Sequence, residues 1–284
     1  MEMYNSFLRL AKLINLGKFT KIENFMPLLV LLISINAALP ALNKRQVKTI
    51  VIDAGHGGHD PGCNYSGVKE KEVTLKIALA LGKKISEELS DVKIIYTRKT
   101  DEFVTLYDRA NIANKNQADL FISIHCNANK NVAIKGTETF TMGLHKAEIN
   151  LDVSKRENDV ILMEKNYEEN YEGFDPNSPE THIILSLHQN AYLDKSLDLA
   201  ARIEKNFIKN KVNTSRGVKQ AGFVVLWKTK MPSILIETGF LSNKSDRALL
   251  TSEEGITKIT SNITSSLVDF KHSIEGVQAK NNND

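Results

Sequence analysis

Two histidines and two glutamates stand where side chains of their type could form a hydrolytic centre. His56, His125 and Glu237 each closely follow a short apolar run, whereas Glu70 stands at the start of a helical pattern. Imidazole nitrogens and carboxylate oxygens are donors that zinc takes, and a catalytic zinc needs about three of them and one open position for water. Two imidazoles and one carboxylate leave the ion with net positive charge, so it remains a good Lewis acid.

Each of these residues also has a purely structural interpretation. A single histidine after a strand is more often a structural residue than a metal ligand. Glu70 and Glu72 both stand where a helix would begin, and the helix dipole favours acidic side chains at that place. Glu72 is therefore a second candidate for the ligand position of Glu70, and Glu237 could be an exposed loop residue.

A glycine-rich turn surrounds His56, with glycines at positions 55, 57, 58 and 62. Glycines let the backbone turn sharply, so that a side chain can reach inward. The turn has neither the G-x-G-x-x-G pattern nor the Lys-Ser/Thr pair of phosphate-binding loops. The sequence therefore disfavours a nucleotide site here.

Apolar runs and helical repeats alternate along the chain, which predicts the elements that position these residues. Strands are expected at 48–54, 92–97, 120–124, 137–141, 223–226 and 234–236, and helices at 70–89, 104–116, about 179–209 and 256–267. This alternation is typical of a single α/β domain with a mostly parallel sheet and helices on both faces. Functional groups of such folds gather at the carboxyl ends of the strands, so His56, His125 and Glu237 should lie at one edge.

The two ends of the chain differ from its body. Residues 1–43 combine basic residues with an apolar core, Leu28–Ala38, which is followed by small residues. This pattern predicts a signal peptide, or alternatively an N-terminal anchor, and either one places the domain 44–272 outside the cytoplasm, in the periplasm or on the cell envelope. The polar tail 273–284 is expected to be disordered.

The net charge and the cysteine content exclude two further classes of protein, those that bind nucleic acid and those built on a disulfide framework. Of the formal net charge of +3, four basic residues against two acidic ones place +2 in the first 41 residues, so the rest is close to neutral. No basic stripe is present, and nucleic acid is excluded as an expected partner. Two cysteines, Cys63 and Cys126, form no disulfide framework, and we interpret Cys126 as a core thiol.

An ordered set of motifs between residues 48 and 270 resembles a known family. These motifs are IVIDAGHGGHDPG, EKEVTL, LYDRANIAN, ADLFISIHCNA, KGTETF and PSILIETGFLSN. They resemble the zinc-dependent N-acetylmuramoyl-L-alanine amidases of the Amidase_3 type, which cleave the amide between the lactyl group of N-acetylmuramic acid and L-alanine in peptidoglycan.

The resemblance implies roles for individual residues. His56, Glu70 and His125 would be the Zn²⁺ ligands, and Glu237 the catalytic carboxylate. The implied fold is a mixed, mostly parallel sheet of about six strands. We interpret Arg109, which lies on a predicted helix, as a structural support of the site.

The polar residues 144–180 read as an insertion on the surface that buries little. Some members of the family use an insertion at this place as a lid over the zinc, which an activator protein displaces. One of four acidic residues in the insertion would then reach the open metal position; these are Glu157, Glu164, Glu168 and Glu169. Peptidoglycan and such an activator are therefore the expected partners.

Two other functions use the same residues. A zinc peptidase on a related scaffold would also need two histidines and a glutamate, but it would cut between amino acids. A non-catalytic cell-wall-binding protein is disfavoured because all three candidate ligands and Glu237 are present.

Overall fold

The computed structural model describes residues 46–144, 148–165, 167–175, 178–186 and 191–276. The predicted leader 1–43 and the last residues of the predicted tail lie outside this part of the chain. The final helix, α11 (Glu253–Glu275), continues three residues beyond the expected boundary at 272. Within the described residues, no helix is both long and apolar enough to cross a membrane.

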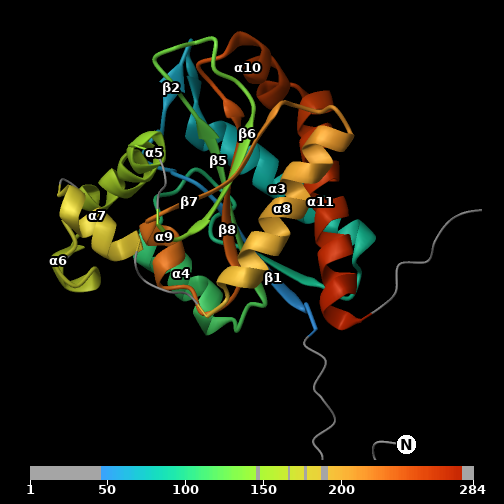
Figure 1. The fold of residues 1–284 in the computed structure, drawn as a ribbon, viewed down its shortest axis with the longest axis horizontal. Helices are drawn as coiled ribbons and strands as arrows, with labels where there is room; N and C mark the ends of the chain where they lie inside the picture. Colours follow the sequence, from blue (N-terminus) through green and yellow to red (C-terminus); the bar gives the residue numbers. More distant parts are fainter. Residues whose placement is uncertain (1–45, 145–147, 166, 176–177, 187–190, 277–284) are drawn as a thin grey trace, which may run out of the picture. The chain divides into compact units, whose positions relative to one another are not determined.

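A six-stranded mixed sheet forms the centre of the domain (Figure 1). Its strands are β1 (Thr49–Ala54), β4 (Lys93–Tyr96), β5 (Leu120–Asn127), β6 (Thr137–Met142), β7 (Ser215–Ala221) and β8 (Ser233–Phe240). The spatial order is β4-β1-β5-β8-β6-β7. The first four strands in that order are parallel, and β6 runs antiparallel to β8 and parallel to β7. The expected single α/β domain with a mostly parallel sheet is confirmed.

One face of the sheet is covered by three long helices: α3 (Glu70–Glu88), α8 (Leu193–Lys209) and α11 (Figure 1). Each of them buries an apolar stripe at helical spacing, for example Leu199, Ile203 and Phe207 of α8. These side chains pack against β1, β5 and β8 in one continuous apolar core. A short helix, α10 (Lys244–Thr251), precedes α11, and a small hairpin of β2 (Asn64–Tyr65) and β3 (Val68–Lys69) precedes α3.

The other face carries α4 (Leu106–Lys115), α9 (Val224–Trp227) and the insertion. The insertion forms α5 (Glu148–Asn158), the 3₁₀ helix η3 (Asp159–Met163), α6 (Tyr167–Asn170) and the start of α7 (Pro179–Ser186). Figure 1 shows these elements together on the left, beside α4 and α9. The expectation that the insertion buries little is wrong, because Val153, Val160, Ile161, Tyr171 and Phe174 are buried in the second core.

Two predicted elements need correction, and one strand was not predicted. The single helix expected over 179–209 is two helices, α7 and α8, because the first packs with the insertion and the second covers the opposite face. The run 223–226 forms the helix α9 rather than a strand; it is buried, and a short buried run has no periodicity that separates the two. The edge strand β7 was not predicted, since its SRGVKQA sequence is polar and half-exposed.

Candidate metal centre

The turn after β1 presents His56 at the carboxyl edge of the sheet. His56 has a φ of 61°, an uncommon conformation for a residue other than glycine. Gly55 lies so close to His125 that a Cβ added at position 55 would be 2.4 Å from Cε1 of that ring. The glycine therefore allows the two imidazoles to lie side by side, with ring centroids 4.9 Å apart.

Two buried arginines hold this turn in place. Arg109 of α4 donates to the carbonyls of Ala54 and His56 at 2.6 and 2.8 Å and pairs with Asp53 at 2.7 Å. Arg98, which follows β4, donates to the carbonyls of Ala54 and Gly55 at 2.9 and 2.8 Å. The supporting role expected of Arg109 thus has a geometric basis, namely the fixed backbone on both sides of Gly55.

Asp60 fixes the orientation of the His56 ring. Nδ1 of His56 lies 2.8 Å from Oδ2 of Asp60, and because a carboxylate only accepts, Nδ1 carries the proton. Nε2 of His56 faces the neighbouring acidic groups and would offer its lone pair to a metal ion. This arrangement of carboxylate, imidazole and free nitrogen is usual for a metal-binding histidine.

Glu70 is the first residue of α3, and two backbone N–H groups hold its carboxylate. Cys126 donates to Oε1 and Cys63 donates to Oε2, both at 2.9 Å. Oε1 also lies 3.1 Å from Nε2 of His56 and 3.2 Å from Nδ1 of His125. Glu72 is exposed and belongs to no ligand cluster within the described residues, so Glu70 is the glutamate that reaches the two histidines.

A fourth side chain, Glu157 of α5, completes the group. Its Oε2 lies 3.2 Å from Nε2 of His56 and 3.0 Å from Nδ1 of His125. One donor atom from each of His56, Glu70, His125 and Glu157 lies within 4.8 Å of the others, and all four side chains are buried. Despite these short distances, Nε2 of His56 and Oε2 of Glu157 make no hydrogen bond to any described residue. Ligand atoms that lie this close without hydrogen bonds between them are consistent with a metal ion bound among them.

The charges in this cluster stabilise one another. Burial by itself lowers the pKa of His125, but the Glu157 and Glu70 carboxylates outweigh it and raise that pKa to about 9. For Glu70 and Glu157 burial acts in the opposite direction and would raise the pKa. The adjacent imidazoles nevertheless hold the pKa values of both glutamates well below their ordinary range. Both glutamates are therefore ionised, as a metal ligand must be.

Glu237 lies beside the cluster without joining it. Residues His125 and Glu237 are register partners on β5 and β8, so the two side chains start from adjacent positions. Neither carboxylate oxygen of Glu237 has a hydrogen-bond partner among the described residues. Burial, reinforced by the Glu157 charge, raises the pKa of Glu237 well above its ordinary value. A carboxyl with a raised pKa is suited to accept and return a proton near neutral pH.

The insertion closes this site. The cavity lined by His56, His125 and the insertion residues Glu157 and Val160 has a volume of only about 10 Å³. That is the space of about one water molecule, so no sugar or peptide fits. Asn158 anchors α5 by donating to the carbonyl of Gly222 at 2.7 Å and accepting from the Val224 N–H at 2.9 Å.

Glu164 anchors the next part of the insertion to α4. It accepts from the Leu106 N–H at 2.7 Å and from the Tyr171 hydroxyl at 2.5 Å. Among the four acidic residues proposed for contact with the metal, only Glu157 thus reaches the cluster. Glu164 caps a helix instead, and Glu168 and Glu169 are exposed.

Other residues that the sequence offered lie away from the cluster. His59 is exposed and its ring stacks on Phe103, with centroids 3.9 Å apart. Cys63 and Cys126 are free thiols, and Cys126 packs in the core, as expected. Sequence reasoning missed Asp60, although its place four residues after His56 in the same turn was a usable signal. It also missed Arg156, whose long side chain could not be placed from the sequence.

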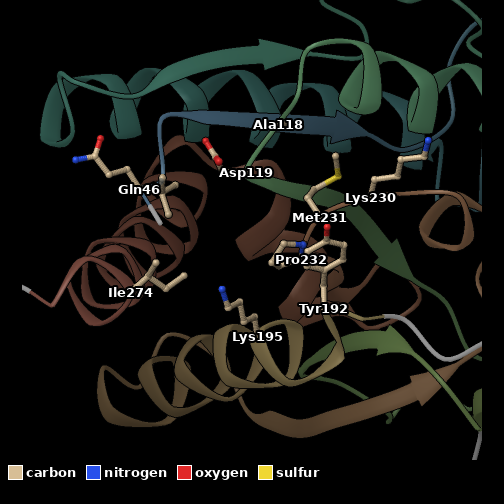
Figure 2. Close-up of a pocket in the computed structure, with 10 residues that line it drawn as sticks. Gln46, Ala118, Asp119, Tyr192, Lys195, Lys230, Met231, Pro232 and Ile274 are labelled. Carbon is tan, nitrogen blue, oxygen red and sulfur yellow. The ribbon is translucent and has the colours of Figure 1, made fainter. Parts of the chain in front are cut away.

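A larger pocket, of about 190 Å³, lies at the opposite edge of the sheet (Figure 2). Its lining includes Ala118, Asp119 and Pro232, which precede β5 and β8, and Lys195 of α8. These residues lie at the amino ends of the parallel strands. The pocket therefore contains none of the four candidate ligands, and the smaller cavity marks the site.

Replacing Asp60 with asparagine is expected to lower the affinity for a divalent metal by about 10- to 100-fold. The neutral amide no longer stabilises the charge on the ring and no longer selects one tautomer. Competition with a chromogenic chelator measures the affinity for Zn²⁺, and Asp269→Asn, an exposed change on α11, is the control. Equal affinities in the two variants would mean that Asp60 does not orient a ligand.

Comparisons with known proteins agree with this geometry. The family model described as N-acetylmuramoyl-L-alanine amidase (Amidase_3) matches residues 50–269. The amidase AmiA of Escherichia coli is 32% identical over 237 residues, which are 82% of this chain and 79% of AmiA. An N-acetylmuramoyl-L-alanine amidase structure from Clostridium difficile 630 is 27% identical, with a TM-score of 0.59 over 80% of this chain and 97% of that one.

A third relative was solved with a protein partner. The CwlD amidase of Clostridioides difficile, in complex with the GerS lipoprotein, is 26% identical, with a TM-score of 0.56 over 78% of this chain and 98% of CwlD. The family match covers most of the chain, and the structural relatives share its sheet and helices. The chain therefore belongs to the Amidase_3 family of N-acetylmuramoyl-L-alanine amidases, which are peptidoglycan hydrolases.

Proposed function

We propose that this protein is an exported, zinc-dependent amidase that cleaves the bond between the lactyl group of N-acetylmuramic acid and L-alanine of the stem peptide. The observation that carries the proposal is the convergence of His56, Glu70 and His125 beside Glu237, whose carboxyl oxygens make no hydrogen bond to the described residues. The family membership supports the substrate, and the donor set supports the metal.

The donor set fits zinc. Two imidazole nitrogens and one carboxylate oxygen are a usual ligand set for a catalytic zinc, which keeps one further position open. His56 would bind through Nε2 and His125 through Nδ1, the atoms that face Glu70. When bound, zinc supplies a Lewis acid for the scissile carbonyl and makes water more acidic.

Glu237 carries the proton between water and the leaving group. It accepts a proton from the attacking water as the new C–O bond forms on the lactyl carbon. As the C–N bond breaks, Glu237 delivers that proton to the nitrogen of L-alanine. The second proton of that water passes from the new carboxyl group to the amine. The products are a glycan with a lactyl carboxylate and a peptide with an ammonium group, so atoms and charges balance.

The insertion keeps the enzyme inactive in the state described. Glu157 faces the ligand atoms of His56 and His125, where it would take the position that water needs. The small cavity excludes the substrate. The exposed apolar side chains of Leu162 and Met163 on the insertion, and of Ile184 just after it on α7, would suit an activator protein that displaces the insertion. The GerS complex of CwlD is a precedent for a protein partner of such an amidase.

Replacing Glu157 with alanine is expected to raise the basal activity about tenfold or more. The contacts of the Glu157 carboxylate with its charged neighbours should stabilise the closed insertion by about 1.5–3 kcal/mol. Because each 1.4 kcal/mol is a factor of ten, their loss shifts the equilibrium toward the open insertion by about that factor or more. Dye release from labelled peptidoglycan measures the activity, and Glu169→Ala, an exposed change in the same insertion, is the control. Unchanged activity in a folded Glu157→Ala protein would argue against the lid.

The point variant is a sharper test than deletion of 144–180. The deletion is also expected to raise basal activity, but it uncovers core residues such as Phe140 and Phe223, which pack with the buried side chains of the insertion. A deleted protein that is inactive is therefore informative only if its thermal unfolding remains cooperative.

Digestion of purified peptidoglycan tests the reaction itself. The Glu157→Ala protein, loaded with zinc, should release peptides that begin with a free L-alanine amine. A chelator should stop the release, and added zinc should restore it. Fragments cut between amino acids would indicate a peptidase instead, and no fragments from the folded, zinc-loaded variant would indicate a wall-binding protein.

A further inference from the structure

The insertion places a second residue, Arg156, against a set of acceptors beside Glu237. Its guanidinium donates to Oδ1 of Asn127 at 3.1 Å and lies 3.5 Å from the carbonyl oxygen of Ala128. The same group is 3.7 Å from Oε1 of Glu237. Two nitrogens of the guanidinium share these acceptors: Nη2 faces Asn127 and Glu237, and Nη1 faces the carbonyl of Ala128, which follows β5.

The acceptor atom of Asn127 is held in a fixed direction. Its amide N–H donates to Oε2 of Glu138 at 3.0 Å, so Oδ1 faces the other way, toward Arg156 and the Ala128 N–H. Asn127 is buried, and it stands two residues after His125 on the same strand. Its Oδ1 contacts Arg156, whose chain neighbour Glu157 faces His125, so Asn127 lies on the side of the sheet that carries the metal site.

Two partly exposed cations beside the buried carboxylate of Glu138 fix this orientation. Glu138 of β6 accepts from Arg216 and Lys219 of β7, both at 2.6 Å. Two cations offset the charge of Glu138, so its carboxylate can accept from Asn127 without an uncompensated buried charge. Neither strand contributes a metal ligand, and this network therefore has no part in holding the ion.

A cavity leads away from these acceptors. It has a volume of about 260 Å³ and lies between the ends of β5, β6 and β7 and the insertion. Asn127, Lys130 and Lys219 line its floor, and Val153 and Arg156 of α5 cover it. Its size suits a few residues of a peptide, and its lining carries charges of both signs, with Lys130 and Lys219 beside Glu138 and Asp152.

We propose that this cavity, the Asn127 pocket, binds the stem peptide, with the N–H of L-alanine donating to Oδ1 of Asn127, where Nη2 of Arg156 donates in this structure. In the closed state the Arg156 guanidinium occupies the place of that nitrogen. After cleavage the nitrogen becomes an ammonium group, a charged donor like the guanidinium it replaces. The inference rests on the proposed function, because it assigns the peptide half of the same substrate to one side of Glu237.

Direct binding of a product-like peptide tests the pocket without hydrolysis. The full chain with both Arg156→Ala and Glu157→Ala, loaded with zinc, is titrated calorimetrically with a synthetic stem tripeptide that has a free L-alanine amine. The N-acetylated tripeptide is the matched ligand. The free amine should bind at least about tenfold more tightly, since a charged donor strengthens a hydrogen bond.

Variants of Asn127 assign the difference to the pocket. In the same background, Asn127→Ala and Asn127→Ser should remove the preference for the free amine, while the exposed Asn116→Ala should retain it. The serine variant keeps a hydroxyl that can donate to Glu138, which protects the fold if alanine does not. Zinc content and unfolding temperature identify the variants that remain folded.

The outcomes separate this proposal from the proposed function. A preference that persists in a folded Asn127 variant, or no peptide binding by the starting protein, overturns the pocket. If the starting protein binds the free-amine peptide but releases no fragments from peptidoglycan, the pocket stands and the proposed reaction fails.

Discussion

Replacing Glu237 with glutamine is expected to lower kcat on peptidoglycan by about 100- to 10,000-fold, the range that a general acid–base residue contributes. Glutamine has nearly the same shape but cannot accept a proton from water and return it to the leaving nitrogen. The effect is measured in the Glu157→Ala background, so that the insertion does not limit the rate. KM should change little, because the substituted group acts on the reacting atoms rather than on substrate binding.

The same substitution should leave the metal site and the fold intact. Glu237 makes no hydrogen bond within the described residues, and burial already disfavours its charged form, so a neutral amide should not destabilise the protein. Zinc content and unfolding temperature should therefore equal or exceed those of the parent. Glu254→Gln, an exposed change on α11, is the control. A Glu237→Gln enzyme of near-normal kcat would assign the proton transfer to another residue.

Replacing His125 with alanine is expected to reduce zinc affinity by more than about 100-fold and to remove the activity with it. The loss should exceed the 10- to 100-fold typical of residues that only orient a ligand, because His125 supplies a donor atom itself. Atomic absorption on the purified protein gives the zinc content, and peptide release gives the activity. Both should fall together.

His59→Ala is the matched control for this variant. His59 is an exposed histidine in the same glycine-rich turn as His56 and stacks on Phe103 instead of facing the ligand cluster. It should retain full zinc content and activity. A His125→Ala protein that binds zinc stoichiometrically and tightly would show that the metal, if present, is held elsewhere, and the proposed ligand set would then be wrong.

The sequence could predict those parts of the site whose position follows directly from the strand that carries them. His56, His125 and Glu237 follow apolar runs that become parallel strands, and the carboxyl ends of such strands meet at one edge. For this reason their proximity followed from the pattern of elements. The choice of Glu70 over Glu72 was different, since both stand in the same first turn and only the direction of the helix separates them.

Contacts between distant segments were beyond reach of the sequence. Four glutamates of the insertion were equal candidates, and the structure separates them, because Asn158 and Glu164 anchor α5 and η3 so that Glu157 alone points to the histidines. The polar composition of this segment hid the few apolar side chains that pack it onto the second core. A few buried apolar contacts therefore decide how this segment packs, and its average polarity does not reveal them.

The sequence by itself determined the fold class, the gathering of His56, His125 and Glu237 toward the carboxyl edge of the sheet, and the resemblance that implied a zinc amidase, although His125 and Glu237 lie within β5 and β8 rather than beyond their ends. These depend on local periodicity and on motif order, which a chain carries in one dimension. Only the tertiary structure decided that the insertion covers the site, that α7 and α8 are separate helices, and that Arg156 meets Asn127 beside Glu237. Those features depend on which side chains meet across the ends of neighbouring strands, and long side chains reach such partners in ways that spacing along the chain does not fix.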